Sequence, residues 1–375
     1  MTQTAERRAL AGGGLPVDRD QVRAAFENPK EFTTSPLYRC LAQTVAATGE
    51  LVDLACQGQP GQYPTFLFFG AVHLLLLAGA DHPLARFYPS IAGARALPPE
   101  DAGPALVSFG REHAAELAET IRTRLVQTNQ VQRAIGLRLG LSVIADEVPG
   151  PVHVIEAGTS AGLNLRFGRY GYRLNARRFG DLASPVQLAA ECHGQEPEPD
   201  LDRQPAIAGV LGIDLHPVDA TDPGERAWLQ ALVWPENHRQ RALLTTALEL
   251  AAADPPPILA GDVIDVLPGF AGTLPAGQPR VVFHSATRMH VPASRLAAFD
   301  AAIERAGDTG PLWRLSIEDA PEAQARHRTA RPGPALQLRR PGTAAAETIA
   351  IVDGHLAWID MSPSHQQPAR SAYSQ

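Results

Sequence analysis

The chain has 375 residues, enough for two domains of ordinary size, and its 45% hydrophobic and 19% charged residues are typical of a globular protein. A formal charge of −7 and basic clusters of only a few arginines disfavour nucleic-acid and anionic-membrane partners, since phosphate groups would be repelled. Its three cysteines are odd in number and irregularly spaced, so neither a disulfide framework nor a metal site is expected.

Residues 17–148 are predicted to form an all-helical N-terminal domain. Asp18 is placed to cap a first helix, and Ser35-Pro36 is placed to begin a second helix that continues to about Cys56. Apolar residues then recur every four positions within 105–147, which predicts one or two amphipathic helices. We find no strand pattern before residue 150.

No segment is predicted to span a membrane or to act as a signal peptide. The longest apolar run, 66–80, is shorter than the ~20 residues that a transmembrane helix requires. The residues after Met1 are polar and do not resemble a signal peptide, so a cytoplasmic location is expected. Residues 1–16 and 362–375 are predicted to be flexible tails.

From 149 to 361 short apolar runs alternate with helical or loop stretches. The predicted strands are 152–158, 208–215, 257–261, 280–284 and 312–317, and the clearest helices between them are 228–253 and 292–306. This alternation predicts an α/β domain with a Rossmann-type, doubly wound, mostly parallel sheet. Three closely spaced runs follow, and Asp353-Gly354 between the last two is typical of a type I′ turn, so the sheet is expected to end in an antiparallel hairpin.

The stretch Glu156-Ala-Gly158-Thr-Ser160-Ala-Gly162-Leu-Asn164 forms a glycine-rich turn after the first predicted strand. Such a turn lets a nucleotide-like ligand approach the backbone and the free N–H groups of the next helix. S-adenosylmethionine has no pyrophosphate and does not require a full G-x-G-x-x-G pattern. We therefore predict that Gly158, Ser160, Gly162 and Asn164 lie against this cofactor.

Acidic residues end three successive predicted strands, which is the arrangement that a crevice ligand requires. Glu156 suits the ammonium of the methionine part, Asp214 the ribose hydroxyls, and Asp262 the adenine amino group or a ribose edge. Asn129 and Arg133 precede the first strand and are candidates to cover the methionine part. The alternative for this last pair is a hydrogen bond at a domain interface.

Other readings of the turn stay open. Gly158-x-Ser160-x-Gly162 matches the nucleophile elbow of α/β-hydrolases, with Asp262 or Asp265 as the acid and His284 or His290 as the base. An elbow follows several strands, however, whereas this turn follows the first. An NAD-binding turn would require glycine at position 160 and an acid about 20 residues later. A non-catalytic protein that binds S-adenosylmethionine is a further alternative.

Two residues are candidates for catalysis. His284 ends the fourth predicted strand and could deprotonate a substrate, because imidazole titrates near neutral pH. Glu236, in Trp234-Pro-Glu-Asn-His-Arg239, is either an active-site carboxylate or an acid in the first turn of a helix. We expect a small-molecule acceptor under a lid formed by the helical domain, and an apolar surface compatible with a homodimer.

Several segments resemble a bacterial family, domain of unknown function 2332. These are Gln127–Arg133, the turn 156–164, Gly212–Asp219, Trp228–Glu236 with Arg239, Gly261-Asp262 through Pro268, and Val281–Ala286. More distantly, the chain resembles class I methyltransferases in its Glu-x-Gly-x-x-x-Gly turn and in the acids that follow the next two strands. That resemblance implies S-adenosylmethionine as cofactor. Ser160 in place of a second glycine, and an insertion over 171–205, depart from the methyltransferase pattern.

Overall fold

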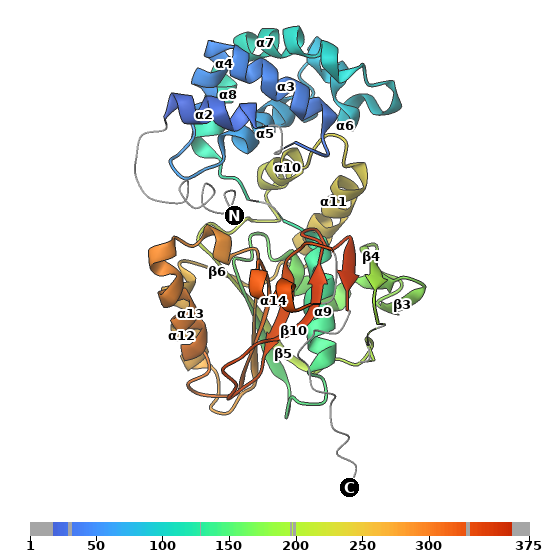
Figure 1. Cartoon of the computed structure of the whole chain (residues 1–375), viewed down its shortest axis with the longest axis vertical. Coiled ribbons are helices and arrows are strands. Elements are labelled where there is room, and N and C mark those ends of the chain that lie inside the picture. The colour runs from blue at the N-terminus through green and yellow to red at the C-terminus, as the bar shows by residue number, and fades with distance from the viewer. Residues whose placement is uncertain are drawn as a thin grey trace. The chain divides into compact units, whose positions relative to one another are not determined.

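The computed structural model describes residues 18–28, 32–127, 129–195, 197, 200–327 and 331–361. The tails predicted at 1–16 and 362–375 lie outside these residues. The chain divides into two compact units (Figure 1). The helical unit takes the residues before 129 together with Asp222–Thr245, and the sheet unit takes Asn129–Thr221 and the residues from Thr246 onward.

This division differs from the predicted one, 17–148 and 149–361, for reasons of packing. Trp228 and Leu232 join the apolar core of the helical unit although they follow the first strands in sequence. The segment after residue 128 instead belongs to the sheet unit, where Gly140 lies so close to the side chain of Leu315 that a Cβ there would be 2.3 Å from it.

The helical unit packs around one strongly apolar helix, α5 (Pro64–Leu77), which buries residues on every side of its axis. Around it lie α2 (Arg19–Glu27), α3 (Pro36–Ala47), α4 (Gly49–Ala55), α6 (Pro89–Ala92), α7 (Gly103–Glu112), α8 (Ala114–Thr123), α10 (Pro223–Ala231) and the start of α11 (His238–Ala253). The predicted caps are confirmed: Asp18 accepts a hydrogen bond from Asp20 N, and Ser35 accepts one from Tyr38 N.

Several predicted helices are divided in the structure. The helix expected from Ser35 to Cys56 is interrupted at Thr48, which lies between α3 and α4. The one or two helices expected within 105–147 are in fact α7, α8 and α9 (Ala134–Val143). The helix expected over 228–253 ends at Ala231, because Pro235 cannot supply an N–H to a continuous helix, and α11 begins after it.

The sheet unit contains a parallel core in the order β6-β5-β1-β7-β8. These strands are β1 (Val152–Ala157), β5 (Ile207–Asp214), β6 (Ile258–Ala260), β7 (Arg280–Ser285) and β8 (Leu312–Glu318). Alternate side chains of β8 face opposite sides: Leu315 packs on α9, whereas Arg314 bonds to Asp300 of α13 (Leu296–Arg305). Helix α12 (Val263–Thr273) packs beside α13 (Figure 1). The predicted α/β class with a mostly parallel sheet is confirmed.

Two features of the sheet differ from the prediction. The insertion forms three unpredicted strands, β2 (Gly171–Leu174), β3 (Arg177–Gly180) and β4 (Gln187–His193), and β4 pairs in parallel with β11 (Trp358–Asp360). The terminal strands β9 (Ala335–Arg339), β10 (Glu347–Val352) and β11 are antiparallel as expected. Their last turn is not type I′, however, because the loop covers 353–357 and its left-handed residue is Leu356, with φ of 54°.

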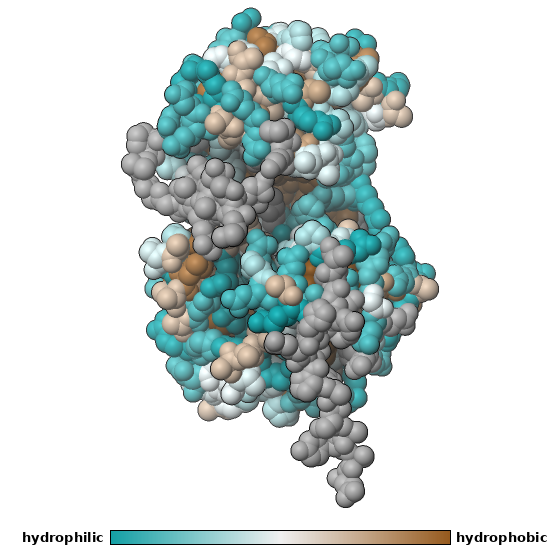
Figure 2. Space-filling model, viewed as in Figure 1, coloured by the Kyte–Doolittle hydropathy of each residue, from teal (hydrophilic) through white to brown (hydrophobic). Residues whose placement is uncertain are grey.

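On the face shown in Figure 2, the sheet unit exposes mainly hydrophilic residues, with hydrophobic ones in small, separate patches. Scattered apolar residues of this kind are ordinary for a protein surface. Among the helices of the described residues, none combines the length and the apolar character that a bilayer-spanning segment requires.

Candidate functional site

The predicted site residues that belong to the sheet unit lie near the point where the strand order of the sheet reverses. From β1 the chain proceeds to β5 and β6 on one side, and then returns to form β7 and β8 on the other side of β1. Open α/β sheets bind ligands at such a point, outside the carboxyl ends of the strands. The turn 158–162 follows β1 there, and the segment 286–290, here called the β7 loop, follows β7.

Three alternate residues of the turn have left-handed backbone conformations. The φ angles are 76° at Gly158, 53° at Ser160 and 69° at Gly162. A Cβ on Gly158 would lie 2.5 Å from Thr287 Oγ1, so this glycine allows the turn to approach the β7 loop. Ser160 lacks that freedom, and its backbone N–H donates a 2.7 Å hydrogen bond to Asp214 Oδ2, which helps to hold the unfavourable conformation.

Glu156 lies beneath the turn and is almost fully buried. Its two carboxylate oxygens accept hydrogen bonds from Thr159 Oγ1 at 2.6 Å and from Asn164 Nδ2 at 2.8 Å. Burial raises the pKa of Glu156 to about 7, against the lowering effect of these two bonds. The carboxylate therefore holds the turn in place through these two bonds. A cation bound nearby would favour the charged form of Glu156.

Asp214 ends β5 and is only partly buried. Besides the bond from Ser160, its Oδ1 accepts a 2.9 Å hydrogen bond from His216 N. A carboxylate has about four lone-pair sites, and a ribose hydroxyl is a donor that such an acceptor suits. The structure thus brings Asp214 to the glycine turn, as its place at a strand end indicates.

Buried polar atoms near the turn lack protein partners. Four such atoms among the described residues are buried and form no hydrogen bond: Ser160 Oγ, Asn164 Oδ1, Ser285 Oγ and Asn129 Nδ2. Buried polar atoms are nearly always hydrogen-bonded, to protein, water or ligand. Ser160 belongs to the turn, Asn164 lies in the 3-10 helix Leu163–Arg169 that follows it, and Ser285 ends β7, so this carboxyl edge has the unsatisfied donors and acceptors that a polar ligand would use.

Arg133 is a half-buried cation that binds only carbonyl oxygens. Its guanidinium donates to Gly354 O at 3.3 Å from both Nε and Nη2, and to Ser285 O at 3.4 Å from Nη1. Burial lowers the pKa of Arg133, while the charges of Glu318 and Glu156 raise it. Within the described part of the chain no ion pair with a carboxylate is formed, so the guanidinium is suited to an anionic group of a ligand.

His284 is not placed to act as a base. Its ring is fully buried, Nδ1 lies 2.8 Å from Glu318 Oε1, and Nε2 lies 3.0 Å from Arg314 Nε. Because the guanidinium can only donate, Nε2 accepts and Nδ1 carries the hydrogen that goes to Glu318. Burial lowers the pKa of His284, against the raising effect of Glu318, so the imidazole stays neutral with both nitrogens engaged. This geometry favours a positioning role over the predicted catalytic one.

His284 belongs to a network that holds the β7 loop. Glu318 also accepts hydrogen bonds from the backbone N–H groups of Thr287 at 2.9 Å and Arg288 at 3.2 Å. Asp300 then bonds Arg288 and Arg314, each at 2.7 Å, which closes a ring of charged groups. Burial raises the pKa of Glu318, but the bonds from His284, Thr287 and Arg288 hold it below its usual value.

Glu236 has a structural role in the helical unit. Its Oε2 accepts a 2.8 Å hydrogen bond from Ser35 Oγ, and its Oε1 accepts a 3.0 Å bond from Leu37 N. It therefore caps the N-terminus of α3, where a negative charge is favourable, and it precedes α11 instead of lying in its first turn. Both oxygens of the carboxylate predicted to be catalytic thus bind the start of α3, and its partner is not Arg239.

Asp262 is likewise committed to local structure. Its Oδ1 accepts a 2.9 Å bond from Ile264 N and caps α12, and its Oδ2 forms a 2.7 Å ion pair with Arg295. The capping role competes with the predicted role in adenine or ribose recognition. The helix cap was the simpler interpretation of an acid before Val263.

The nucleophile-elbow reading lacks its central contact. Although Ser160 has the positive φ that such a turn requires, its Oγ has no hydrogen-bond partner among the described residues. His284 is committed to Glu318, and Asp262 to Arg295. These residues therefore form no serine–histidine–acid relay.

Sequence reasoning missed Ser285 and Thr287 of the carboxyl edge, and it missed His355. Thr287 Oγ1 donates a 3.0 Å hydrogen bond to Ala157 O and so joins the β7 loop to the end of β1. Small polar residues after a buried strand were the available signal for the first two. His355 lies in the β10–β11 loop, and nothing in its sequence neighbourhood indicates proximity to Arg133.

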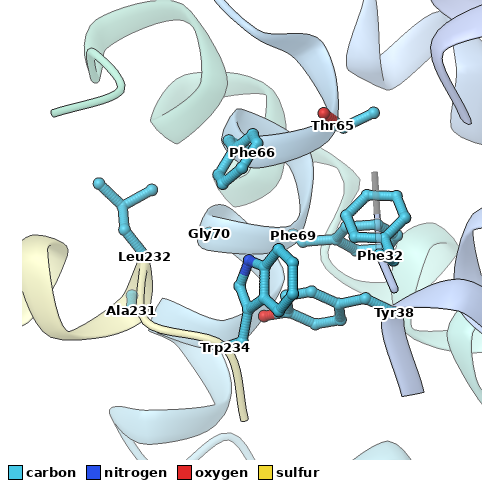
Figure 3. A pocket seen from close by; sticks show the side chains of 9 residues that line it. All are labelled: Phe32, Tyr38, Thr65, Phe66, Phe69, Gly70, Ala231, Leu232 and Trp234. Atoms are coloured by element: carbon cyan, nitrogen blue, oxygen red, sulfur yellow. The ribbon is translucent and has the colours of Figure 1, made fainter. Parts of the chain in front are cut away.

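A small cavity lies in the helical unit (Figure 3). It is lined by Phe32, Tyr38, Thr65, Phe66, Phe69, Gly70, Ala231, Leu232 and Trp234. Its volume of about 10 Å³ corresponds to roughly one water molecule. Tyr38 stacks on Phe69 with ring centroids 4.5 Å apart, so the cavity is part of the packing of an aromatic core.

Comparisons with known proteins place the chain in a family. Among solved structures it is similar to the crystal structure of WbdD, with 12% identity over 53% of this chain and 31% of that chain, and a TM-score of 0.25. It is also similar to a DhpI-SAM-HEP complex, with 14% identity over 66% of this chain and 80% of that one, and a TM-score of 0.23. The match thus spans less than a third of the WbdD chain.

A search of curated proteins found no match. The family model described as "Uncharacterized protein conserved in bacteria (DUF2332)" matches residues 23–361, nearly all of the described chain. The protein therefore belongs to the DUF2332 family of bacterial proteins.

Proposed function

We propose that the sheet unit binds S-adenosylmethionine at the turn 158–162 and that the protein is a methyltransferase acting on a small-molecule acceptor. The observation that carries this proposal is the bond between Ser160 N and Asp214 Oδ2. It places an acid from the end of β5 against a left-handed turn after β1, at the switch point where a nucleoside ligand is expected.

The residues around the turn fit the separate parts of this cofactor. Asp214 would accept hydrogen bonds from the ribose hydroxyls, and Leu215, 61% exposed beside it, offers an apolar surface for the adenine. Glu156 would favour the ammonium and sulfonium charges electrostatically. Arg133 would bind the methionine carboxylate, with Asn129 and Asn164 offering their unpartnered amide atoms. Asp262 is left out because it caps α12.

When bound, S-adenosylmethionine supplies an activated methyl group. The contribution of the protein is then mainly positioning, since transfer to a free nucleophile requires alignment more than acid–base chemistry. The network of His284, Glu318 and Arg314 fixes the β7 loop, and Thr287 ties that loop to the end of β1. These residues keep the carboxyl edge preorganised for ligand.

Isothermal titration calorimetry tests the cofactor assignment. S-adenosylmethionine and S-adenosylhomocysteine are expected to bind the full chain with micromolar dissociation constants and to raise its melting temperature, whereas NAD is not. Binding of NAD in preference to both would overturn the proposal. If either ligand binds but methyl transfer is absent with every acceptor tried, the non-catalytic alternative is favoured instead.

A further inference from the structure

Ser285, which ends β7, projects to the side of the sheet that α9 covers. The preceding residue, His284, contacts Phe299 of α13 on the opposite side, with ring centroids 5.5 Å apart, and successive side chains of a strand alternate. Ser285 pairs with Ile317 of β8, and a Cβ on Gly136 of α9 would lie 2.5 Å from Ile317 Cδ1. Because paired residues project to the same side, the hydroxyl of Ser285 faces α9.

Arg133 lies on this side of the sheet, directly before the first residue of α9. Its Nη1 donates to Ser285 O at 3.4 Å, and its other bonds among the described residues go to Gly354 O. The guanidinium therefore meets no carboxylate there, although it has five N–H donors. Ser285 Oγ is buried and has no hydrogen-bond partner. An unused hydroxyl and a cation without an anionic partner thus belong to two residues in direct contact.

Glu156 of β1 projects to the same side. The residues before and after it pack with α12 and α13 in one apolar cluster, so its own side chain faces the other way. Its carboxylate accepts from Asn164 Nδ2, and the 3-10 helix that contains Asn164 packs on α9. In the register of the two strands Glu156 is opposite Phe283, two residues before Ser285. Neighbouring strands thus present an acid and a hydroxyl on one face.

This combination of groups suits an α-amino acid, which carries a carboxylate and an ammonium on a single carbon atom. Arg133 and Ser285 supply donors for the carboxylate, whereas Glu156 and the unpartnered Oδ1 of Asn164 supply acceptors for the ammonium. Bonds between arginine and a carboxylate are charge-assisted and are stronger than neutral ones. A buried hydroxyl without a partner is unfavourable, and a ligand carboxylate would satisfy it.

We propose that Ser285 Oγ joins Arg133 in binding the carboxylate of the cofactor, with Glu156 facing its ammonium, so that the site selects an intact α-amino-acid group. This inference rests on the proposed function, to which it adds Ser285 and a requirement for the carboxylate. Decarboxylated S-adenosylmethionine retains the nucleoside, the sulfonium and the amine, and it would bind poorly. The donor is then S-adenosylmethionine itself and not its decarboxylated form.

Isothermal titration calorimetry of the full chain with S-adenosylmethionine and with its decarboxylated form tests the carboxylate site. We expect the decarboxylated form to bind the wild type about 100-fold more weakly, because bonds to a guanidinium and to a hydroxyl are lost. Ser285→Ala should weaken the binding of S-adenosylmethionine about tenfold and should change that of the decarboxylated form about twofold or less. Ser294→Ala, at an exposed serine of the sheet unit, is the matched control and should bind both ligands like the wild type.

A purely structural role of Ser285 would give a different result. Because its hydroxyl has no protein partner, Ser285→Ala should leave the melting temperature of the nucleoside-free protein unchanged or raise it. A lower melting temperature with an equal loss of affinity for both ligands would assign the hydroxyl to the structure of the edge and overturn the inference. An unchanged ratio of the two dissociation constants in Ser285→Ala would also overturn it.

Failure of the proposed function has a separate signature. If neither form of the nucleoside binds the wild type, the cofactor assignment is wrong and the inference is rejected with it. If both forms bind with similar affinity, the nucleoside assignment stands and only the carboxylate site is wrong. Methylthioadenosine, which lacks the amine as well, should bind no more tightly than the decarboxylated form, and tighter binding would contradict the role of Glu156.

Discussion

The backbone N–H of Ser160 donates a 2.7 Å hydrogen bond to the carboxylate of Asp214, which ends a neighbouring strand 54 residues later in the sequence. Since Ser160 has a φ of 53°, an unfavourable conformation for a non-glycine residue, the carboxylate helps to fix the shape of the turn. Under the proposed function the same carboxylate also accepts hydrogen bonds from the ribose hydroxyls. Turn geometry and proposed ribose recognition therefore depend on one side chain.

Replacing Asp214 tests this double dependence. Asp214→Ala should reduce the affinity for S-adenosylhomocysteine by at least tenfold, because it removes the proposed ribose acceptor, and should lower the free energy of unfolding by about 1–3 kcal/mol, because Ser160 N loses its partner. Calorimetry and urea denaturation measure the two effects. Asp308→Ala, at an exposed acid after α13, should change neither. Unaltered nucleoside affinity in Asp214→Ala would reject the ribose assignment.

The raised pKa of Glu156 predicts an unusual pH dependence. Between pH 4.5 and about 7 the folded protein keeps a proton on Glu156 that the unfolded chain releases, so this residue makes stability fall as the pH rises through that window. The rise from 4.5 to about 7 corresponds to about 3 kcal/mol.

Glu156→Gln removes the titration, so the variant should gain stability relative to the wild type by up to this amount between pH 5 and pH 8. Urea denaturation at both pH values measures the difference. A difference between the two proteins that does not change with pH would contradict the prediction. The variant should also lose affinity for S-adenosylmethionine at pH 8, where the wild-type carboxylate is charged.

Removal of the His284 ring should be strongly destabilising. His284→Ala leaves the buried Glu318 and the partly buried Arg314 without the group that connects them, which is expected to cost about 3 kcal/mol. His238→Ala, at an exposed histidine that begins α11, should cost less than about 0.5 kcal/mol. A His284→Ala protein of wild-type stability that has lost only activity would instead restore the catalytic interpretation of this residue.

The lowered pKa of His284 adds a test by pH. As the pH falls through 6.5, the unfolded chain takes up a proton that the folded ring refuses, so His284 makes the wild type less stable in acid. A His284→Gln variant should lack that contribution. Comparison of the two proteins by urea denaturation at pH 5.5 and 7.5 would reveal it.

Local patterns predicted the core of the sheet but not its edge. The first strand and its turn are readable because an apolar run is followed by glycines, and Asp214 because an acid ends the next buried strand. By contrast, β2 and β3 are short, and exposed arginines dilute their apolar pattern, so no local signal distinguishes them from a loop.

The side-chain roles that could not be predicted depend on distant partners. Glu236 caps a helix whose first residue lies 200 positions earlier, and the bond from Ser35 has no counterpart in local sequence. His284 ends a strand as a catalytic histidine would, and only the positions of Glu318 and Arg314 reveal that both ring nitrogens are occupied. Strand-end position thus predicted which residues lie at the carboxyl edge of the sheet but not the contacts that each of them makes there.

Two glycine substitutions should have opposite effects. Gly158→Ala places a Cβ 2.5 Å from Thr287 Oγ1 on a residue with φ of 76°, so we expect a loss of about 2–3 kcal/mol from backbone strain and from displacement of the β7 loop. Gly269→Ala, in the interior of α12 where a Cβ would meet no atom within 4 Å, should stabilise the protein by up to about 1 kcal/mol.

The double variant Gly158→Ala/Thr287→Ala separates the two causes of the loss at Gly158. Removing the threonine side chain creates room for the new Cβ but leaves the left-handed backbone at residue 158 strained. Gly158→Ala should therefore cost less stability in the Thr287→Ala background than in the wild type, but the cost should not disappear. Urea denaturation of the four proteins in the cycle gives the coupling energy. A coupling near zero would mean that the turn does not depend on its contact with Thr287, because the strain at residue 158 would then account for the whole effect.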